Sequence, residues 1–408
     1  MKKMKLLFLG AYGISSLGDD AMMVALKEGL ENRGHEVEVT ALCRHKKDSI
    51  DYYNKYGVSL LRNLDHDRKP KVPSRFRGFN TGDDRSHLKE INDSIAASDL
   101  VVLGGGDAFI DYLSGMFSSP LAYIRMILTL ALFNNKPIVL AGISVVPIDT
   151  QIGRDTAAFI CDVANKIILR DTASIDVLKD YNICADSNRT LILPDAVVGL
   201  KKREVLSEDL LCKLKQAQEK PCVIGVSVRS LYWEDEKEDA VIFENFAKVL
   251  DKAVDDLNAS IVFIPQCTYD KDDPKKDDRN VANKVIELMK NKTNAISLNK
   301  HYCVKDVLKF YSECDYVLGM RHHSIVFSSI AATPCMALSY SDKVKNYMHD
   351  LSMDKYICDV RTNSSEEVYS TFKELVSSAH EVREHLKEAQ KSNLIKWQKY
   401  LDTIEELI

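Results

Sequence analysis

Residues Cys314–Tyr340 read CDYVLGMRHHSIVFSSIAATPCMALSY, and the order of apolar and small residues in this segment predicts strand, turn, helix and strand. The apolar run that ends at Gly319 is typical of a buried parallel strand. A helix is expected from about His323, because apolar residues then recur at helical spacing, and Pro334 ends it. Arg321 and His323 are therefore expected where the carboxyl end of a strand meets the N-terminus of a helix.

That position favours an anion. The first turn of a helix carries unpaired N–H groups and a partial positive charge. Open α/β sheets also bind their ligands outside the carboxyl ends of the strands. The sequence thus predicts an anion bound by Arg321, with His323 beside it as a proton donor. The alternative is an Arg–carboxylate pair next to a histidine that caps the helix.

The same alternation of strand and helix recurs along most of the 408 residues, which predicts an α/β fold of two doubly wound domains with parallel sheets. We expect domains at 1–200 and 201–362, followed by a helical extension at 363–408 that has a pair of amphipathic helices. A return of the last helix to the first domain would bury Trp397. The expected strands are Lys5–Leu9, Glu36–Leu42, Leu100–Leu103, Pro137–Ala141, Lys166–Leu169, Thr190–Leu193, Cys222–Val228, Ser260–Pro265, Ala295–Leu298, Tyr316–Gly319, Cys335–Tyr340 and Tyr356–Val360.

Residues 49–86 are the least regular part of the sequence. Seven basic side chains lie between Arg62 and Arg85, with Phe76 and Phe79 among them. A solvated surface loop is the simpler interpretation. The alternative is a loop that contacts an anionic acceptor or the headgroup of a lipid-linked one.

Composition is that of an ordinary globular protein, with 45% hydrophobic and 28% charged residues. A net charge of −5 provides no general attraction to nucleic acid. The ten cysteines show neither disulfide-framework nor zinc spacing, so a reducing cytoplasm is expected. No run approaches the length of about 20 apolar residues that spans a membrane, which leaves only peripheral membrane association open.

Two glycine-containing loops follow expected strands. The loop GAYGISSLGDD ends at Asp19 and Asp20, which are also common helix caps. The loop Gly104-Gly105-Gly106-Asp107 offers backbone N–H groups that suit a phosphate, a carboxylate or a sugar hydroxyl. Neither loop has the spacing of a dinucleotide-binding or Walker A motif.

Further cationic residues stand at strand ends. Arg170 and Arg229 each follow a strand, as Arg321 does, and Lys343 follows the next one. One such arginine is usually a salt-bridge partner, but three equivalent ones indicate a small and highly charged anion. Gln266, at another strand end, is placed to hydrogen-bond a hydroxyl. No metal-binding cluster is visible, and no cofactor is implied.

Together these motifs resemble the polysaccharide pyruvyl transferase family over nearly the whole chain. The matching pieces are Gly18-Asp19-Asp20, Gly104–Asp107, Arg170-Asp171, Val226–Arg229, Gly319–His323, and Ala337–Tyr340 with Lys343. The resemblance implies two Rossmann-like domains that face a cleft, as in GT-B enzymes. It also implies phosphoenolpyruvate as donor, a glycan acceptor that can be lipid-linked, and a pyruvate ketal as product. In that chemistry His323 is the expected general acid and Asp19 a candidate base, while Arg321 and Arg170 bind phosphate and carboxylate with help from Arg229 or Lys343.

Three positions depart from the family pattern. Ser16-Leu17 stands where the family often has Asn, Ala141–Ser144 replaces a segment that often contains Gln-Gly, and His322 replaces an apolar residue. The acceptor sugar therefore stays open. Two other functions also remain: a GT-B glycosyltransferase with a nucleotide-sugar donor, and a non-catalytic protein that binds a glycan or anion.

Overall fold

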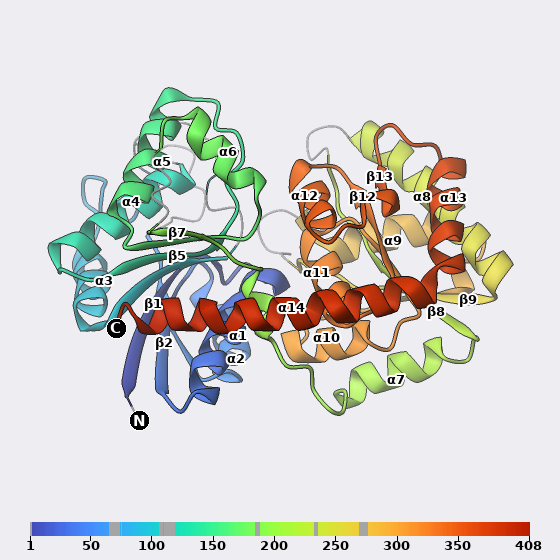
Figure 1. Cartoon of the computed structure of the whole chain (residues 1–408), viewed down its shortest axis with the longest axis horizontal. Coiled ribbons are helices and arrows are strands. Elements are labelled where there is room, and N and C mark those ends of the chain that lie inside the picture. The colour runs from blue at the N-terminus through green and yellow to red at the C-terminus, as the bar shows by residue number, and fades with distance from the viewer. Residues whose placement is uncertain are drawn as a thin grey trace. The chain divides into compact units, whose positions relative to one another are not determined.

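The computed structural model describes the chain except residues 1, 65–73, 75, 106–108, 110–118, 184–187, 232–235 and 269–275. The chain forms two compact units. The first contains Met1–Ile14, Asp19–Leu200 and Ile395–Ile408, and the second contains Ser15–Gly18 and Lys201–Leu394. Each is a parallel α/β unit, as the sequence predicts (Figure 1).

The sheet of the first unit has the strand order β3-β2-β1-β4-β5-β6-β7, and its neighbouring strands pair in parallel. β4 and β5 are buried throughout, which is why they read as continuous apolar runs. The strands are β1 Lys3–Tyr12, β2 Glu36–Cys43, β3 Val58–Arg62, β4 Leu100–Gly104, β5 Ile138–Ile143, β6 Lys166–Leu169 and β7 Thr190–Ile192.

Helices lie on both sides of this sheet (Figure 1). One core cluster joins the strands to α3, α4, α5 and α6, and it includes Ile95, Ile127 and Ile160. The helical elements of this part of the chain are α1 Leu17–Asn32, α2 Lys46–Asn54, α3 Ser86–Ala97, α4 Pro120–Phe133, α5 Gln151–Val163, α6 Ala173–Asp180 and η1 Ala196–Gly199.

The sheet of the second unit has the order β10-β9-β8-β11-β12-β13, again with parallel pairs. β11 therefore lies between β8 and β12, near the middle of the sheet. The strands are β8 Cys222–Ser227, β9 Ala259–Phe263, β10 Ala295–Ser297, β11 Tyr316–Gly319, β12 Cys335–Ser339 and β13 Ile357–Asp359.

The helices of the second unit form two groups. α8 packs against α9 and α13, whereas α10 packs against α7 and α11, and α11 packs against α12. The helical elements are α7 Glu208–Ala217, α8 Glu236–Leu257, α9 Asp278–Leu288, η3 Lys292–Asn294, α10 Val304–Tyr311, α11 His322–Ile330, α12 Asp342–Asp350, η4 Asp354–Tyr356, α13 Ser365–Ser377 and α14 Ala379–Glu405.

Residues 49–86 are more regular than the sequence indicated. Most of α2 and all of β3 fall in this stretch, and β3 pairs with β2 from Val58 to Arg62. The basic and aromatic residues farther on are not simply a solvated loop, because Phe76 is fully buried and its ring packs edge-on against Phe79 and Tyr123. Arg68, Lys69, Lys71 and Arg75 lie outside the described residues.

The C-terminal segment returns to the first unit, as expected. The Trp397 ring lies against the backbone of Gly29 and Gly199 and is almost fully buried. Arg33, just after α1, donates to Asp402 and Glu405, both at 2.7 Å. The last residues of α14 are therefore part of the fold of the first unit.

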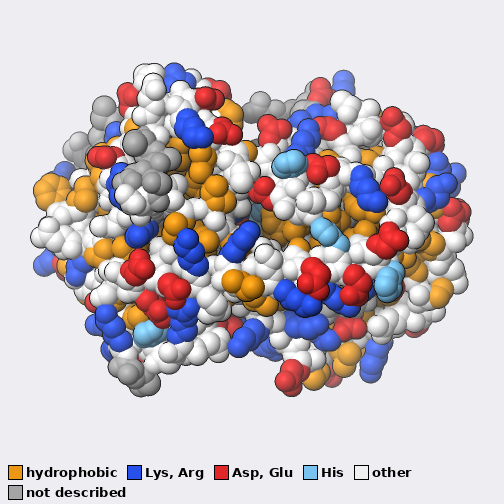
Figure 2. All heavy atoms as spheres, in the orientation of Figure 1, with side chains coloured by type: hydrophobic (Ala, Val, Ile, Leu, Met, Phe, Trp, Pro, Cys, Tyr) orange, Lys and Arg blue, Asp and Glu red, His pale blue; other side chains and the backbone are white. Residues whose placement is uncertain are grey.

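Among the described residues, no helix has both the length and the apolar character needed to cross a membrane. On the face drawn in Figure 2, basic and acidic side chains alternate over the surface of both units. This mixture agrees with the small net charge of −5.

Candidate functional site

Arg321 lies between β11 and α11, at the carboxyl end of a central strand. Its backbone carbonyl accepts from the N–H of Ser324 at 3.0 Å and from the Ser324 hydroxyl at 2.5 Å, which closes the first turn of α11. Met320 N–H donates to the Ser227 carbonyl at 2.9 Å and so ties the turn to β8. The turn fixes where the Arg321 side chain leaves the sheet.

The Arg321 guanidinium forms a two-pronged ion pair with Asp278, the first residue of α9. Nε donates to both carboxylate oxygens at 3.2 and 3.1 Å, and Nη2 donates to Oδ1 at 2.5 Å. Burial alone would lower the pKa of Arg321, but the charge of Asp278 raises it above its ordinary value. The guanidinium is therefore permanently charged.

Arg229, after β8, is held by an aromatic side chain. Its guanidinium lies over the Tyr340 ring at 4.7 Å from the centroid, and Nη1 donates to the Tyr340 hydroxyl at 2.6 Å. Burial, and next the charge of Arg321, lowers the pKa of Arg229 below its ordinary value. The two guanidinium groups thus lie near enough for their positive charges to repel each other.

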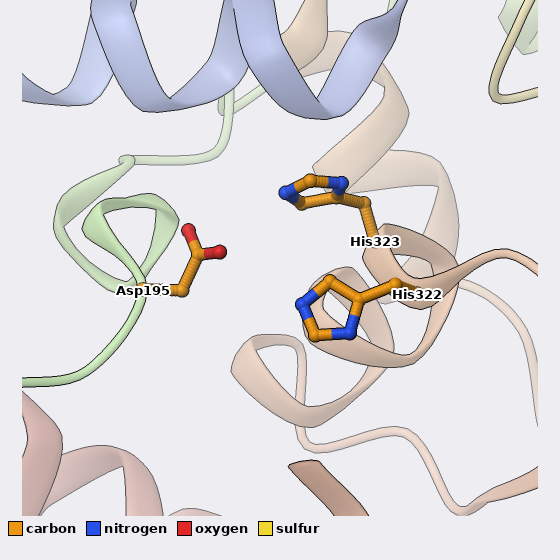
Figure 3. Close-up of side chains that lie close together, drawn as sticks. All are labelled: Asp195, His322 and His323. Carbon is orange, nitrogen blue, oxygen red and sulfur yellow. The ribbon is translucent and has the colours of Figure 1, made fainter. Parts of the chain in front are cut away.

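His323 is the second residue of α11, and Figure 3 shows its ring beside that of His322. Its ring meets the His322 ring edge-on, with centroids 5.1 Å apart and an interplanar angle of 81°. His322 is buried and also meets the Tyr347 ring edge-on at 5.2 Å. These two aromatic contacts hold the His322 ring beside His323. His322 is one of the three positions at which the sequence departs from the family pattern.

Residues 15–18 of the first loop also pack against this site, since they belong to the second unit. Leu17 N–H donates to the Gln266 carbonyl at 2.9 Å, and Thr268 N–H donates to the Ser15 carbonyl at 3.1 Å. These bonds bring Gly18 against His323: a Cβ added at Gly18 would lie 1.9 Å from His323 Nδ1. Only glycine fits this approach.

Gln266 is buried beyond the end of β9. Its Nε2 donates to the Tyr311 hydroxyl at 2.9 Å, while Oε1 has no hydrogen-bond partner among the described residues. The backbone N–H groups of Gln266 and Cys267 donate to Asp278 at 3.0 and 2.9 Å. The residue therefore supports the Arg321–Asp278 pair through its backbone.

Arg170 belongs to the first unit and is enclosed there. Nε donates to the Ser144 hydroxyl at 2.7 Å, and Nη1 donates to Asp195 at 2.9 Å. Ser144 in turn donates to Asp171 at 2.5 Å, and Asp171 accepts from Ser174 at the start of α6. The side chains of Arg170 and Asp195 are only 3% and 1% exposed, so this network supports the ends of β5 and β6.

The two glycine-containing loops meet at the ends of β1 and β4. The Tyr12 hydroxyl donates to the Gly104 carbonyl at 3.1 Å. Gly105 has φ +81° and lies against Asp19, whose Oδ1 would be 2.9 Å from a Cβ at Gly105. Burial, followed by the charges of Asp19 and Asp20, raises the pKa of Tyr12 well above its ordinary value. Asp19 is thus held at the strand ends of the first unit.

The remaining predicted residues are placed as follows. Lys343 lies half-buried in the first turn of α12, which follows β12. Gly106 and Asp107 lie outside the described residues. The structure brings Arg229, Arg321, His323 and Gln266 to the strand ends of the second unit, and Asp19, Gly104, Gly105 and Arg170 to those of the first.

The carboxylates that hold the two arginines, Asp278 and Asp195, were not predicted from the sequence. Asp278 precedes Arg321 by 43 residues and Asp195 follows Arg170 by 25, so no local motif links either pair. Asp278 does carry one local signal. It follows Asp277, which caps α9 by accepting from Arg279 N–H at 2.9 Å, and acidic residues are common at helix starts.

The family model of the polysaccharide pyruvyl transferases matches residues 17–342. The chain belongs to this family. A curated relative, the amylovoran biosynthesis protein AmsJ of Erwinia amylovora, is 22% identical over 382 residues, which cover 88% of this chain and 89% of AmsJ.

Solved structures show the same fold. HepE of Anabaena, solved with UDP and glucose, superposes with a TM-score of 0.63 at 12% identity and covers 99% of this chain and 98% of its own. The UDP-GlcNAc 2-epimerase of Methanocaldococcus jannaschii gives a TM-score of 0.57 at 9% identity, with 91% and 92% coverage. This member of the polysaccharide pyruvyl transferase family thus has the expected GT-B-like fold.

Proposed function

We propose that the chain transfers the pyruvyl group of phosphoenolpyruvate to a sugar of a cell-surface polysaccharide or of its lipid-linked precursor. The product is a pyruvate ketal, and phosphate is released. Family membership supports a pyruvyl transfer. The observation that carries the donor assignment is the pair of guanidinium groups, Arg321 and Arg229, at adjoining strand ends with His323 two residues beyond Arg321.

The donor demands such a pair because it bears a carboxylate and a phosphate on one enol carbon. Arginine binds both groups through parallel N–H donors. Arg321 retains donors for this purpose, since its contacts with the described residues use only Nε and Nη2. Arg229 would bind the second anionic group. Candidates for further contacts with the donor or the acceptor are Lys343, Gln266 and the loop at Gly104–Asp107. Arg170 would support the ends of β5 and β6 in the first unit.

The chemistry requires one proton at the methylene carbon of the donor. His323 would deliver it as general acid, which leaves an oxocarbenium-like carbon for attack by a first sugar hydroxyl. Phosphate then leaves, and a second hydroxyl attacks the same carbon to close the ketal. Of the two hydroxyl protons, one replaces the proton that His323 gave and the other departs with phosphate. Asp19 is the candidate base for an acceptor hydroxyl.

The test combines binding and turnover. Phosphoenolpyruvate should stabilise the wild type by about 3 kcal/mol at about 100 times its Kd, read as a dose-dependent rise in melting temperature. Arg321→Ala should lose the rise. His323→Ala should keep it but lose phosphate release in a glycan-acceptor assay by about 10²- to 10⁴-fold.

Arg203→Ala is the matched control, because Arg203 also pairs with a buried carboxylate of the second unit, Asp306, and is not one of the predicted site residues. It should respond to phosphoenolpyruvate as the wild type does. Stabilisation by UDP-glucose and not by phosphoenolpyruvate would instead indicate a glycosyltransferase. Binding of phosphoenolpyruvate without phosphate release from any glycan tested would indicate a non-catalytic binding protein.

A further inference from the structure

Asp278 is the residue on which three segments of the second unit converge. It is the first residue of α9 and is only 1% exposed. Its Oδ2 accepts the backbone N–H groups of Gln266 and Cys267 at 3.0 and 2.9 Å, which fixes the carboxylate relative to the end of β9. Both of its oxygens also accept from Arg321 across the sheet. The carboxylate therefore cannot rotate without losing backbone bonds.

The way in which Asp278 holds Arg321 leaves one edge of the guanidinium available. A guanidinium is a planar fork with donors on Nε, Nη1 and Nη2. Asp278 engages the edge formed by Nε and Nη2. Among the described residues nothing accepts from Nη1, and the Arg321 side chain is 20% exposed. The end formed by Nη1 and Nη2 is thus free for a second planar or tetrahedral anion.

On electrostatic grounds alone, an aspartate beside Arg321 is unfavourable for anion binding. A carboxylate beside an anion-binding arginine cancels its charge and weakens its attraction for an anion. A buried ion pair also costs desolvation that its Coulomb energy repays only in good geometry. What the pair provides is orientation, because an arginine side chain otherwise loses considerable rotamer freedom when it binds a ligand.

We propose that Asp278 is a positioning residue that holds the free end of the Arg321 guanidinium toward the anionic donor. This inference rests on the proposed function for the identity of the donor, phosphoenolpyruvate, but not for the anion-binding role of Arg321. The fixed orientation of the Arg321 guanidinium then contributes more to anion binding than is lost because Asp278 neutralises part of its positive charge. Removal of the negative charge should therefore weaken anion binding, the opposite of what simple charge counting predicts.

The test measures binding of phosphoenolpyruvate and of inorganic phosphate by calorimetry, together with kcat and KM. Asp278→Asn, which keeps the shape of the side chain and adds net positive charge, should weaken binding of both anions by about 10- to 100-fold and lower kcat as well. Asp277→Asn is the matched control: Asp277 is equally buried at the start of α9 and pairs with Arg279, not with Arg321. It should bind both anions within about twofold of the wild type.

Equal or tighter anion binding by Asp278→Asn would overturn the proposal, because charge would then outweigh orientation. If that variant does not fold, Arg321→Lys decides, since lysine keeps the charge but has no planar edge to orient. Wild-type affinity in Arg321→Lys would overturn the proposal, and a loss as large as that of Arg321→Ala would support it. Binding of inorganic phosphate distinguishes failure of the proposed function from failure of the Asp278 proposal. A wild type that binds phosphate but does not use phosphoenolpyruvate refutes the proposed function alone. A wild type that binds neither anion refutes the role of Asp278 as well.

Discussion

At the scale of single residues, Gly18 packs so tightly against His323 that it leaves no room for a side chain. A Cβ at position 18 would lie 1.9 Å from Nδ1 and 2.2 Å from Cγ of the His323 ring. Gly18→Ala should therefore push the ring from its position beside His322. A displacement of about 1 Å in a catalytic group can cost about 10²-fold in rate, so we expect kcat to fall by about that factor while phosphoenolpyruvate still binds. Steady-state kinetics with a glycan acceptor and a thermal-shift titration measure the two effects.

Gly34→Asn is the control for this substitution. Gly34 lies just beyond the other end of α1, has φ +89° and has no atom within 4 Å of an added Cβ. Asparagine tolerates that backbone conformation, so the variant should keep wild-type kcat. An unchanged kcat in Gly18→Ala would show that the position of His323 does not limit the reaction.

At the scale of elements, the segment around Phe76 behaves as core. Phe76 is fully buried, and its ring packs at 5.8 Å from Phe79 and 6.3 Å from Tyr123 of α4. Phe76→Ala should destabilise the first unit by about 3–5 kcal/mol, because a buried ring leaves a cavity that its neighbours fill only in part. Urea unfolding followed by circular dichroism measures the loss.

Phe133→Ala in the same unit provides the comparison. Phe133 ends α4 and is 80% exposed, so its removal should change stability by no more than about 0.5 kcal/mol. If both substitutions lower the free energy of unfolding equally, the segment around Phe76 does not contribute to the core. It would then be a solvated loop, the simpler interpretation of the sequence.

The sequence predicted elements well where one physical signal decides them. The strand Tyr316–Gly319 was predicted with its observed bounds, because a buried parallel strand is apolar throughout and ends at a glycine. Strand β3 was missed: its outward residues Ser59 and Arg62 interrupt the apolar run, and charged residues follow it. Helix α2 was also missed, because its sequence, KKDSIDYYN, is mostly polar and shows no clear apolar face.

For the site, the sequence predicted which residues lie at the ends of strands, but not which side chains from other segments contact them. Parallel strands bring their carboxyl ends to one edge, so Arg170, Arg229 and Arg321 were predicted at equivalent strand ends. The structure places Arg229 and Arg321 after the paired strands β8 and β11, and Arg170 in the first unit. The partners Asp278 and Tyr340 depend on which side chains meet across the sheet. That outcome follows from packing between distant segments, which the spacing of residues does not encode.

At the scale of the whole molecule, the two units are not two consecutive halves of the sequence. The last helix, α14, starts among residues of the second unit, and Ile395–Ile408 belong to the first. The first unit is therefore complete only when the final residues of the chain are present. Trp397 contributes most plainly, since its ring lies against Gly29 and Gly199 and packs on Tyr400 with centroids 5.1 Å apart.

Trp397→Ala should consequently destabilise the first unit by about 3–5 kcal/mol, although the substitution lies near the C-terminus, a region that often tolerates change. Hydrogen exchange followed by mass spectrometry resolves where the loss occurs. Peptides from β1 and β5 should exchange faster, because the cavity opens beside α1 and η1, which carry the glycines that Trp397 contacts. Ile395→Ala, on the same helix but 74% exposed, should leave exchange in these strands unchanged. If Trp397→Ala also leaves β1 and β5 unchanged, the C-terminal segment only covers the first unit and is not part of its core.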